Sequence, residues 1–107
     1  MATTTFSKQP NDVLDYDVDM ADWFADIPGD NISDIAVSVT SAIEEVPTLV
    51  AGPAPHPAVV KLGTEPTRFK VWLGGGTDYT TYTVTCVVRT QADRVKEVEF
   101  NVKVRNA

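Results

Sequence analysis

The sequence contains a single cysteine, Cys86, and a single histidine, His56, among its 107 residues. One cysteine excludes an internal disulfide framework and any zinc site built from several cysteines, and one isolated histidine does not complete such a site. A catalytic pair would have to join Cys86, on the inward face of a predicted strand, to His56 in a proline-rich loop. We therefore expect Cys86 to be a buried, unreactive thiol.

Long apolar runs and basic stripes are also missing. No segment reaches the ~18 apolar residues that a membrane-spanning helix needs. The amino terminus has no apolar segment of the kind that a secretory signal carries, so we expect a protein made in, and suited to, a reducing cytoplasm. No basic stripe carries interleaved aromatic residues, so we expect neither nucleic acid nor membrane among the partners.

Charge is distributed unevenly along the chain. Residues 1–66 carry eleven Asp or Glu and two Lys, whereas residues 67–107 carry seven Lys or Arg and four Asp or Glu. The total is −6. Such asymmetry favours contact between copies of the chain or docking on a basic partner, although ordinary solvated surfaces would also give it.

What is present is a strong period-two alternation in the last forty residues, 67–105. Apolar residues at every second position predict half-buried strands around 69–73, 82–88 and 98–104. Gly74, Gly75 and Gly76 follow the first of these strands and predict a turn. A phosphate-binding loop would need a longer glycine spacing, a lysine and a following helix, and a strand follows here.

Tyr82 lies at the spacing of a tyrosine corner, in which a tyrosine at the start of a strand bonds back to the backbone a few residues upstream. The alternative is an ordinary aromatic residue of the core. We predict an all-β, immunoglobulin-like antiparallel sandwich of about seven strands over residues 13–107.

The first part of the chain is less regular. Residues 1–12 hold few apolar side chains and are predicted to be an arm that is flexible or becomes ordered on a partner. A first strand is predicted over 14–20, a helical turn with Trp23 or Phe24 at the end of the sandwich over 22–27, and a second strand over 35–39. Short strands are expected at 48–51 and 58–62, on either side of a proline loop.

The first strand has an acidic outer face formed by Asp15, Asp17 and Asp19. Their spacing, with Asp26 further on, partly matches a calcium loop, but Met20 replaces the glycine that such a loop requires. Alternation along a strand also spreads the carboxylates over a face. We therefore predict no metal, no cofactor and no catalytic residue.

The segment Val13–Phe24, with its Leu-Asp-Tyr and Asp-Trp elements, resembles the opening of a family of small structural proteins of tailed bacteriophages. Val71–Thr77, Tyr82–Thr85 and the turn residue Arg94 are similar as well. Two features depart from the family pattern: the proline loop is longer, and Phe24 replaces a tryptophan.

The resemblance implies an immunoglobulin-like minor structural protein of the virion, often a fibre-to-tail adaptor, that binds other tail, fibre or capsid proteins and copies of itself. We predict no enzyme activity. The expected interface residues are Phe6, the acidic face, Trp72 and Tyr79. The alternatives are a capsid decoration protein, or a carbohydrate-binding module in which Trp72 and Tyr79 stack on a ligand; Trp72 could instead pack under the proline loop.

Overall fold

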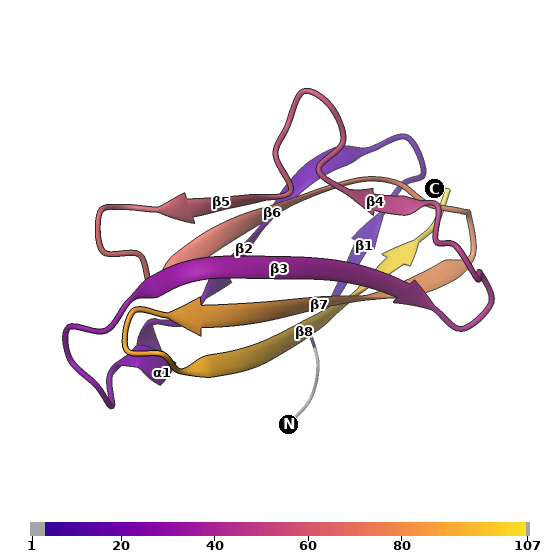
Figure 1. The fold of residues 1–107 in the computed structure, drawn as a ribbon. Coiled ribbons are helices and arrows are strands. Elements are labelled where there is room, and N and C mark those ends of the chain that lie inside the picture. The colour runs from indigo at the N-terminus through magenta and orange to yellow at the C-terminus, as the bar shows by residue number, and fades with distance from the viewer. Residues whose placement is uncertain (1–3, 107) are drawn as a thin grey trace.

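The computed structural model describes residues 4–106, which form eight strands and one short helix (Figure 1). The elements in chain order are β1 Thr5–Lys8, β2 Val13–Asp19, α1 Ala21–Phe24, β3 Ile32–Ser41, β4 Leu49–Ala51, β5 Val59–Leu62, β6 Arg68–Gly75, β7 Thr80–Thr90 and β8 Val95–Val104.

The strands form two sheets that face each other. One sheet has the order β1-β8-β7-β3, and the other has the order β2-β6-β4, with β5 also paired to β6 (Figure 1). β2 pairs along most of one edge of β6, so β4 and β5 share its other edge in succession. The predicted all-β sandwich is confirmed; its immunoglobulin-like class stays a prediction.

The core lies between the sheets and follows the predicted alternation. β7 contributes Tyr82, Val84, Cys86 and Val88, all fully buried, and β6 contributes Phe69, Val71 and Leu73. These side chains meet because the inward residues of two facing strands interdigitate. Burial raises the pKa of the Cys86 thiol to about 11, as expected for an unreactive cysteine.

Part of the segment predicted as an arm, residues 1–12, forms a strand in the structure. Thr5–Lys8 is β1, which pairs in parallel with β8, so the first sheet is mixed rather than antiparallel. Phe6 packs against the rings of Tyr16 and Phe100, with centroids 5.0 and 5.5 Å away. Residues 1–3 of the predicted arm lie outside the described residues.

Lys8 explains why this strand is hard to recognise in the sequence. It occupies an inward position and is buried, where an apolar residue would signal a strand. Its Nζ donates to the carbonyl oxygens of Gln9 and Gly75 at 2.7 and 2.6 Å, so the buried ammonium is satisfied by backbone. Burial lowers the pKa of Lys8, while Asp12 raises it in part.

The predicted helical turn is present as α1, and it closes one end of the sandwich with the buried ring of Phe24. Residues 41–63, whose course the sequence leaves open, form a loop after β3, then β4, the proline loop and β5 (Figure 1). Among residues 4–106, no helix is long and apolar enough to cross a membrane.

The place of Phe6 in the aromatic cluster yields a stability prediction. Phe6→Ala should lower the free energy of unfolding by about 2 kcal/mol, because it removes a partly buried ring. Urea denaturation would measure the change. Ser7→Ala, at an exposed position of the same strand, is the control and should stay within about 0.5 kcal/mol of the parent. An unchanged Phe6→Ala protein would mean that this segment does not pack on the sheet.

Candidate functional site

One end of the sandwich, here called the Tyr79 end, is formed by the β3–β4 loop, residues 42–48, and the β6–β7 loop, residues 76–79. The two loops meet at the carboxylate of Glu44. Its Oε1 accepts hydrogen bonds from the Tyr82 hydroxyl at 2.6 Å and from the backbone N–H of Thr48 at 3.0 Å. Its Oε2 accepts from the Thr77 hydroxyl at 2.6 Å. Glu44 therefore ties three segments together.

Tyr82 supplies the link between this carboxylate and the core. Its ring is fully buried, and its hydroxyl oxygen accepts the backbone N–H of Thr77 at 2.9 Å. A bond to backbone five residues upstream is the contact that defines a tyrosine corner. The hydroxyl thus fixes the β6–β7 loop with one bond and the β3–β4 loop with the other.

The glycine turn makes this close approach of the loops sterically possible. Gly75 and Gly76 have φ of +78° and +102°. A Cβ on Gly75 would lie 2.7 Å from the Thr48 carbonyl oxygen, and one on Gly76 would lie 2.7 Å from a Val104 methyl group. The turn lies later than predicted: Gly74 and Gly75 are the last residues of β6 and pair with β2 and β4, and residues 76–79 connect β6 to β7.

The Tyr79 end displays large apolar side chains. Ile43, Val46 and Tyr79 are 75%, 81% and 76% exposed. The Arg105 guanidinium lies 5.1 Å from the centre of the Tyr79 ring, and Tyr79 takes a positive φ of 62°. Hydrogen-bonded loops that hold apolar residues out in water present a surface suited to protein contact.

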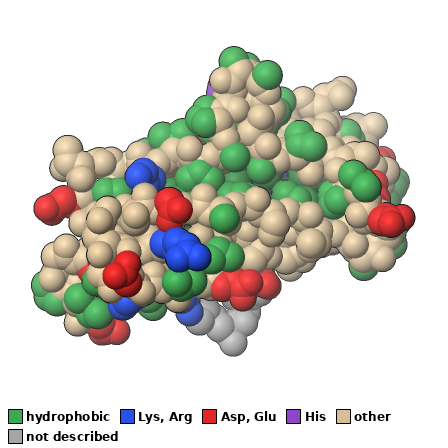
Figure 2. Space-filling model, viewed as in Figure 1, with side chains coloured by type: hydrophobic (Ala, Val, Ile, Leu, Met, Phe, Trp, Pro, Cys, Tyr) green, Lys and Arg blue, Asp and Glu red, His purple; other side chains and the backbone are tan. Residues whose placement is uncertain are grey.

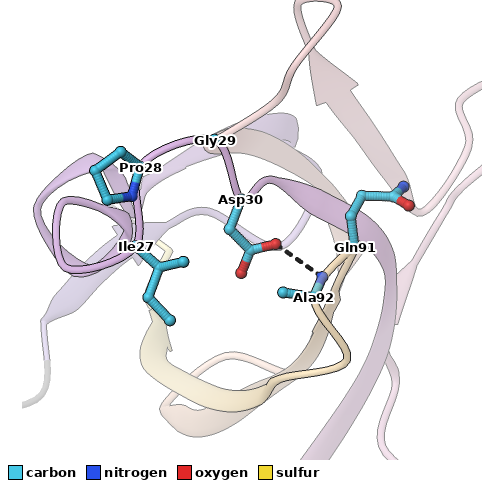
Figure 3. Close-up of a pocket in the computed structure, with 6 residues that line it drawn as sticks. All are labelled: Ile27, Pro28, Gly29, Asp30, Gln91 and Ala92. Atoms are coloured by element: carbon cyan, nitrogen blue, oxygen red, sulfur yellow. Dashed lines mark hydrogen bonds between the residues drawn. The ribbon is translucent and has the colours of Figure 1, made fainter.

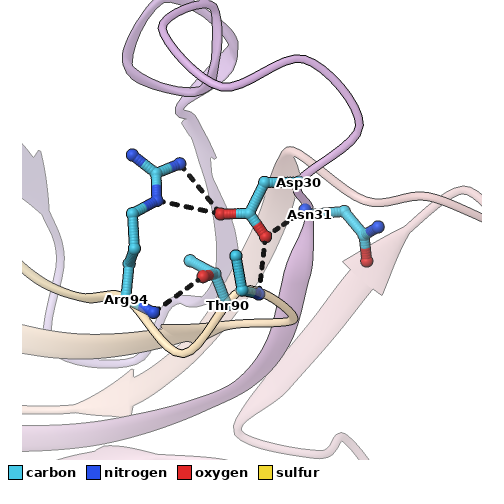
Figure 4. Close-up of polar contacts among 5 residues, drawn as sticks. Asp30, Asn31, Thr90 and Arg94 are labelled. Atoms are coloured by element: carbon cyan, nitrogen blue, oxygen red, sulfur yellow. Dashed lines mark hydrogen bonds and ion pairs between the residues drawn. The ribbon is translucent and has the colours of Figure 1, made fainter.

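The opposite end, here called the Arg94 end, is formed by α1, residues 25–31 and the β7–β8 turn. Its centre is the ion pair of Asp30 and Arg94, in which Nε and Nη2 of Arg94 both lie 2.9 Å from Oδ2 of Asp30 (Figure 4). Oδ1 accepts the backbone N–H groups of Asn31 and Ala92 at 3.0 and 2.9 Å. The Asp30 side chain has no exposed area, so these bonds replace its hydration.

The ring of Trp23 completes the cluster. The Arg94 guanidinium carbon lies 4.1 Å from the Trp23 ring centre, a distance typical of a cation–π contact. Burial raises the pKa of Asp30, but the hydrogen bonds from Ala92, Thr90, Arg94 and Asn31 outweigh it and leave this pKa below its ordinary value. Asp30 therefore stays charged, and its contacts with Arg94 and Ala92 lock the β7–β8 turn to the segment after α1.

A shallow pocket of about 310 Å³ lies beside this cluster, lined by Ile27, Pro28, Gly29, Asp30, Gln91 and Ala92 (Figure 3). Asp30 points toward Ala92 and makes its bonds within the wall. The carboxylate is thus committed to holding the two loops together, and the pocket offers a ligand mainly backbone and aliphatic surface.

The acidic face of β2 is partly neutralised in the structure. The Lys70 ammonium lies 2.7 Å from an Asp15 oxygen and 3.7 Å from one of Asp17, and this pairing lowers the pKa of Asp15. Asp19 accepts the backbone N–H of Ala21 at the start of α1. The three carboxylates are exposed but have different roles, and among residues 4–106 no cluster of three metal-ligating side chains occurs.

One face of the Trp72 ring is covered by another side chain. The His56 ring from the proline loop stacks on it with centroids 3.6 Å apart and planes at 5°. The packing of Trp72 under the proline loop, one of the two predicted arrangements, is the one observed. Phe6 is likewise engaged in the aromatic cluster, so Tyr79 is the expected interface aromatic that lies most open to solvent.

Sequence reasoning missed Glu44 and Asp30. Glu44 follows Ser41 by three residues, and the Ser41 hydroxyl accepts the backbone N–H of Glu44 at 3.3 Å. That Ser-x-x-Glu spacing is a local loop signal. Nothing in the sequence indicates that Tyr82, 38 positions further along, completes the site.

An all-β sandwich with stiff loops that display apolar side chains has the form of a protein-binding structural module. A family described as the podophage GP4 fiber-tail adaptor protein gp77 matches residues 8–103. The chain belongs to this family of bacteriophage structural proteins, and it is therefore a component of the virion. No curated protein matches the chain.

The Glu44 contacts predict a pH dependence of stability. Hydrogen bonds from Thr77, Tyr82 and Thr48 lower the pKa of Glu44 from 4.5 to about 2. A carboxyl group whose pKa is lower in the folded state stabilises the fold above its unfolded pKa and loses that contribution as the pH falls through its folded pKa. The free energy of unfolding, measured by denaturation between pH 6 and 2, should therefore fall less in Glu44→Gln than in the parent. The difference should develop between about pH 4.5 and pH 2. Parallel curves for the two proteins would contradict this role.

The Asp30–Arg94 cluster predicts an order among variants. Arg94→Ala should destabilise the protein most, because it leaves the buried Asp30 carboxylate without its cation. Arg94→Lys should lie between Arg94→Ala and the parent, since an ammonium restores charge but not the planar contact with Trp23. Lys96→Ala, two residues further on, is the control. Thermal unfolding gives the order, and equal melting temperatures for all four proteins would refute it.

Proposed function

We propose that the protein acts as a non-catalytic adaptor that joins fibre and tail components of the virion by docking through its Tyr79 end. The match to the fiber-tail adaptor family over residues 8–103 carries the proposal. Ile43, Val46 and Tyr79 form the contact surface, and the partner is another virion protein.

The loops of the Tyr79 end are preorganised for binding. The Glu44 carboxylate holds both loops before any partner arrives, so little chain entropy is lost when the loops bind. Apolar side chains that are more than two-thirds exposed gain the most when a partner removes them from water. The surface needs no further ordering to act as a docking site.

The acidic face of β2 provides a second, weaker contact with a basic surface. Asp17 is more available there than Asp15, because its side chain is 68% exposed while that of Asp15 is 35% exposed and lies closer to Lys70. Copies of the chain arranged around a tail would repeat both contacts and raise the total affinity through avidity. The family match favours the tail over a capsid decoration role.

The stacking of His56 on Trp72 bears on the carbohydrate-binding alternative. A sugar ring binds by lying flat on an exposed aromatic face, and His56 already covers one face of this indole. Tyr79 belongs to a different part of the protein, the β6–β7 loop that Glu44 fixes, whereas Trp72 packs against the proline loop. A virion adaptor is thus the function that the site supports best.

Particle assembly tests the proposal directly. The double variant Ile43→Ser with Val46→Ser should incorporate into tails at least about tenfold less than the parent, because it removes apolar area from the docking surface. Val95→Ser, which changes an exposed valine at the Arg94 end, is the control and should incorporate normally. Quantitative immunoblotting of purified particles measures the ratio. Normal incorporation of the double variant would remove the Tyr79 end from the mechanism.

A further inference from the structure

The two flanks of the sandwich, where the edges of the sheets meet, are closed in different ways. On the β1–β2 flank, the rings of Phe6, Tyr16 and Phe100 fill the space between the sheets. On the other flank, β3 faces β4 and β5, and the aliphatic side chains between them remain partly exposed. These side chains form a seam, consisting of Ile35, Val37, Val39, Ala51 and Val59.

Figure 2 shows this flank from outside, with hydrophobic side chains gathered along the line between β3 and the β4–β5 edge. Seam residues recur at every second position of β3, because its inward and outward side chains alternate. The seam is therefore an apolar strip with the repeat of a β-strand.

β3 has one free edge along this seam. It is the last strand of its sheet and pairs with β7 on the other side. Within residues 4–106, two hydrogen bonds from other segments reach this free edge. The Lys61 ammonium donates to the Ser33 carbonyl oxygen, and the Ile32 N–H donates to the Pro66 carbonyl oxygen. Both contacts lie at the first residues of the strand, so the stretch from Ile35 onward has no such cover.

Edge strands in monomeric proteins are commonly protected by proline, lysine, bulges or a covering loop. β3 is ten residues long, contains neither proline nor lysine, and carries one charged side chain, Asp34. Its register on β7 shifts between Ile32 and Asp34, so the irregularity in this strand lies at its start, before Ile35. The facing edge, formed by β4 and β5, is protected by the proline loop that connects these two strands. The loop leaves the sheet at Gly52, whose N–H donates to the Trp72 carbonyl oxygen, and returns at Ala58, whose carbonyl oxygen accepts the Trp72 N–H. On this flank, the unprotected edge is thus the stretch of β3 from Ile35 onward.

We infer that β3 receives an extended segment of a partner virion protein, which adds as a strand to the free edge and places alternate apolar side chains in the seam. A segment of this kind satisfies the backbone groups of the edge and covers the aliphatic strip in one step. Because Asp34 is exposed and makes no ion pair with residues 4–106, the segment carries a basic residue near that end. This inference rests on the proposed adaptor function.

The seam favours a free segment over a second copy of the chain. An edge strand of another copy could share backbone hydrogen bonds with β3. Its inward side chains, however, are already held in its own core and could not enter the seam. A helix or a small molecule would leave the backbone groups of β3 unpaired.

Proline substitution separates edge pairing from folding. Adjacent residues of a strand direct their N–H groups to opposite sides, so one of Ala36→Pro and Val37→Pro removes a bond to β7 and the other removes a donor from the free edge. The variant that keeps a near-parental melting temperature is the test protein. Ser38→Ala, which alters an exposed side chain of β3 but no backbone group, is the matched control.

The test protein should incorporate into tail particles at least about tenfold less than the parent and Ser38→Ala. Amide hydrogen exchange of the parent provides a second measurement that needs no variant: the amides of residues 35–41 that point to the free edge should exchange at least about tenfold more slowly in the particle than in the free protein.

Protection of the Tyr79 end without protection of β3 would overturn the inference and leave the adaptor function intact. A parent protein that is absent from particles would overturn the adaptor function and the inference together. If the isolated chain forms dimers that the test protein loses, a second copy is the occupant and the partner segment is wrong.

Discussion

The hydrogen bond from the buried Tyr82 hydroxyl to the Glu44 carboxylate, at 2.6 Å, is the contact on which the Tyr79 end depends. The Tyr82 ring is buried among the core side chains of β7, while its hydroxyl oxygen reaches the loops. The same oxygen accepts the Thr77 N–H, so one side chain transmits the rigidity of the core to two loops. A carboxylate with several donors is held more firmly than a neutral group would be, because charge-assisted hydrogen bonds are the stronger ones.

The Arg94 end uses the same principle with a different set of residues. Asp30 is buried and fully engaged, and Arg94 lies between its carboxylate and the Trp23 ring. The two ends of the sandwich are therefore each fixed by one carboxylate that accepts backbone and side-chain donors from separate loops. Such ends suit a structural connector, which has to keep its surfaces in a fixed relation to each other while it carries load between partners.

The two flanks of the sandwich differ from each other, whereas the two ends are fixed in a similar way. The β1–β2 flank is sealed by three aromatic rings, whereas the β3 flank combines a free strand edge with a partly exposed aliphatic strip. A flank of the second kind gives up some burial within the chain, and it keeps hydrogen-bonding groups and apolar area available for association. An adaptor built in this way has its Tyr79 end and its β3 flank on different sides of one rigid body, so two partners could be bound without competing for the same residues.

The amino-acid sequence by itself determined the strands and the core, because alternation at period two identifies the inward residues of β6, β7 and β8 wherever they are apolar. It also indicated the glycine turn and the tyrosine corner, whose signals are local. It could not reveal β1, since the inward Lys8 breaks the apolar pattern and is satisfied by carbonyl groups that only the fold brings near. Glu44 and Asp30 were equally invisible, because their partners lie 38 and 64 positions away in the chain. Only the tertiary structure decided that Trp72 is covered by His56, that Lys70 neutralises part of the acidic face and that β3 is left at an open flank, since each of these depends on which strands become neighbours.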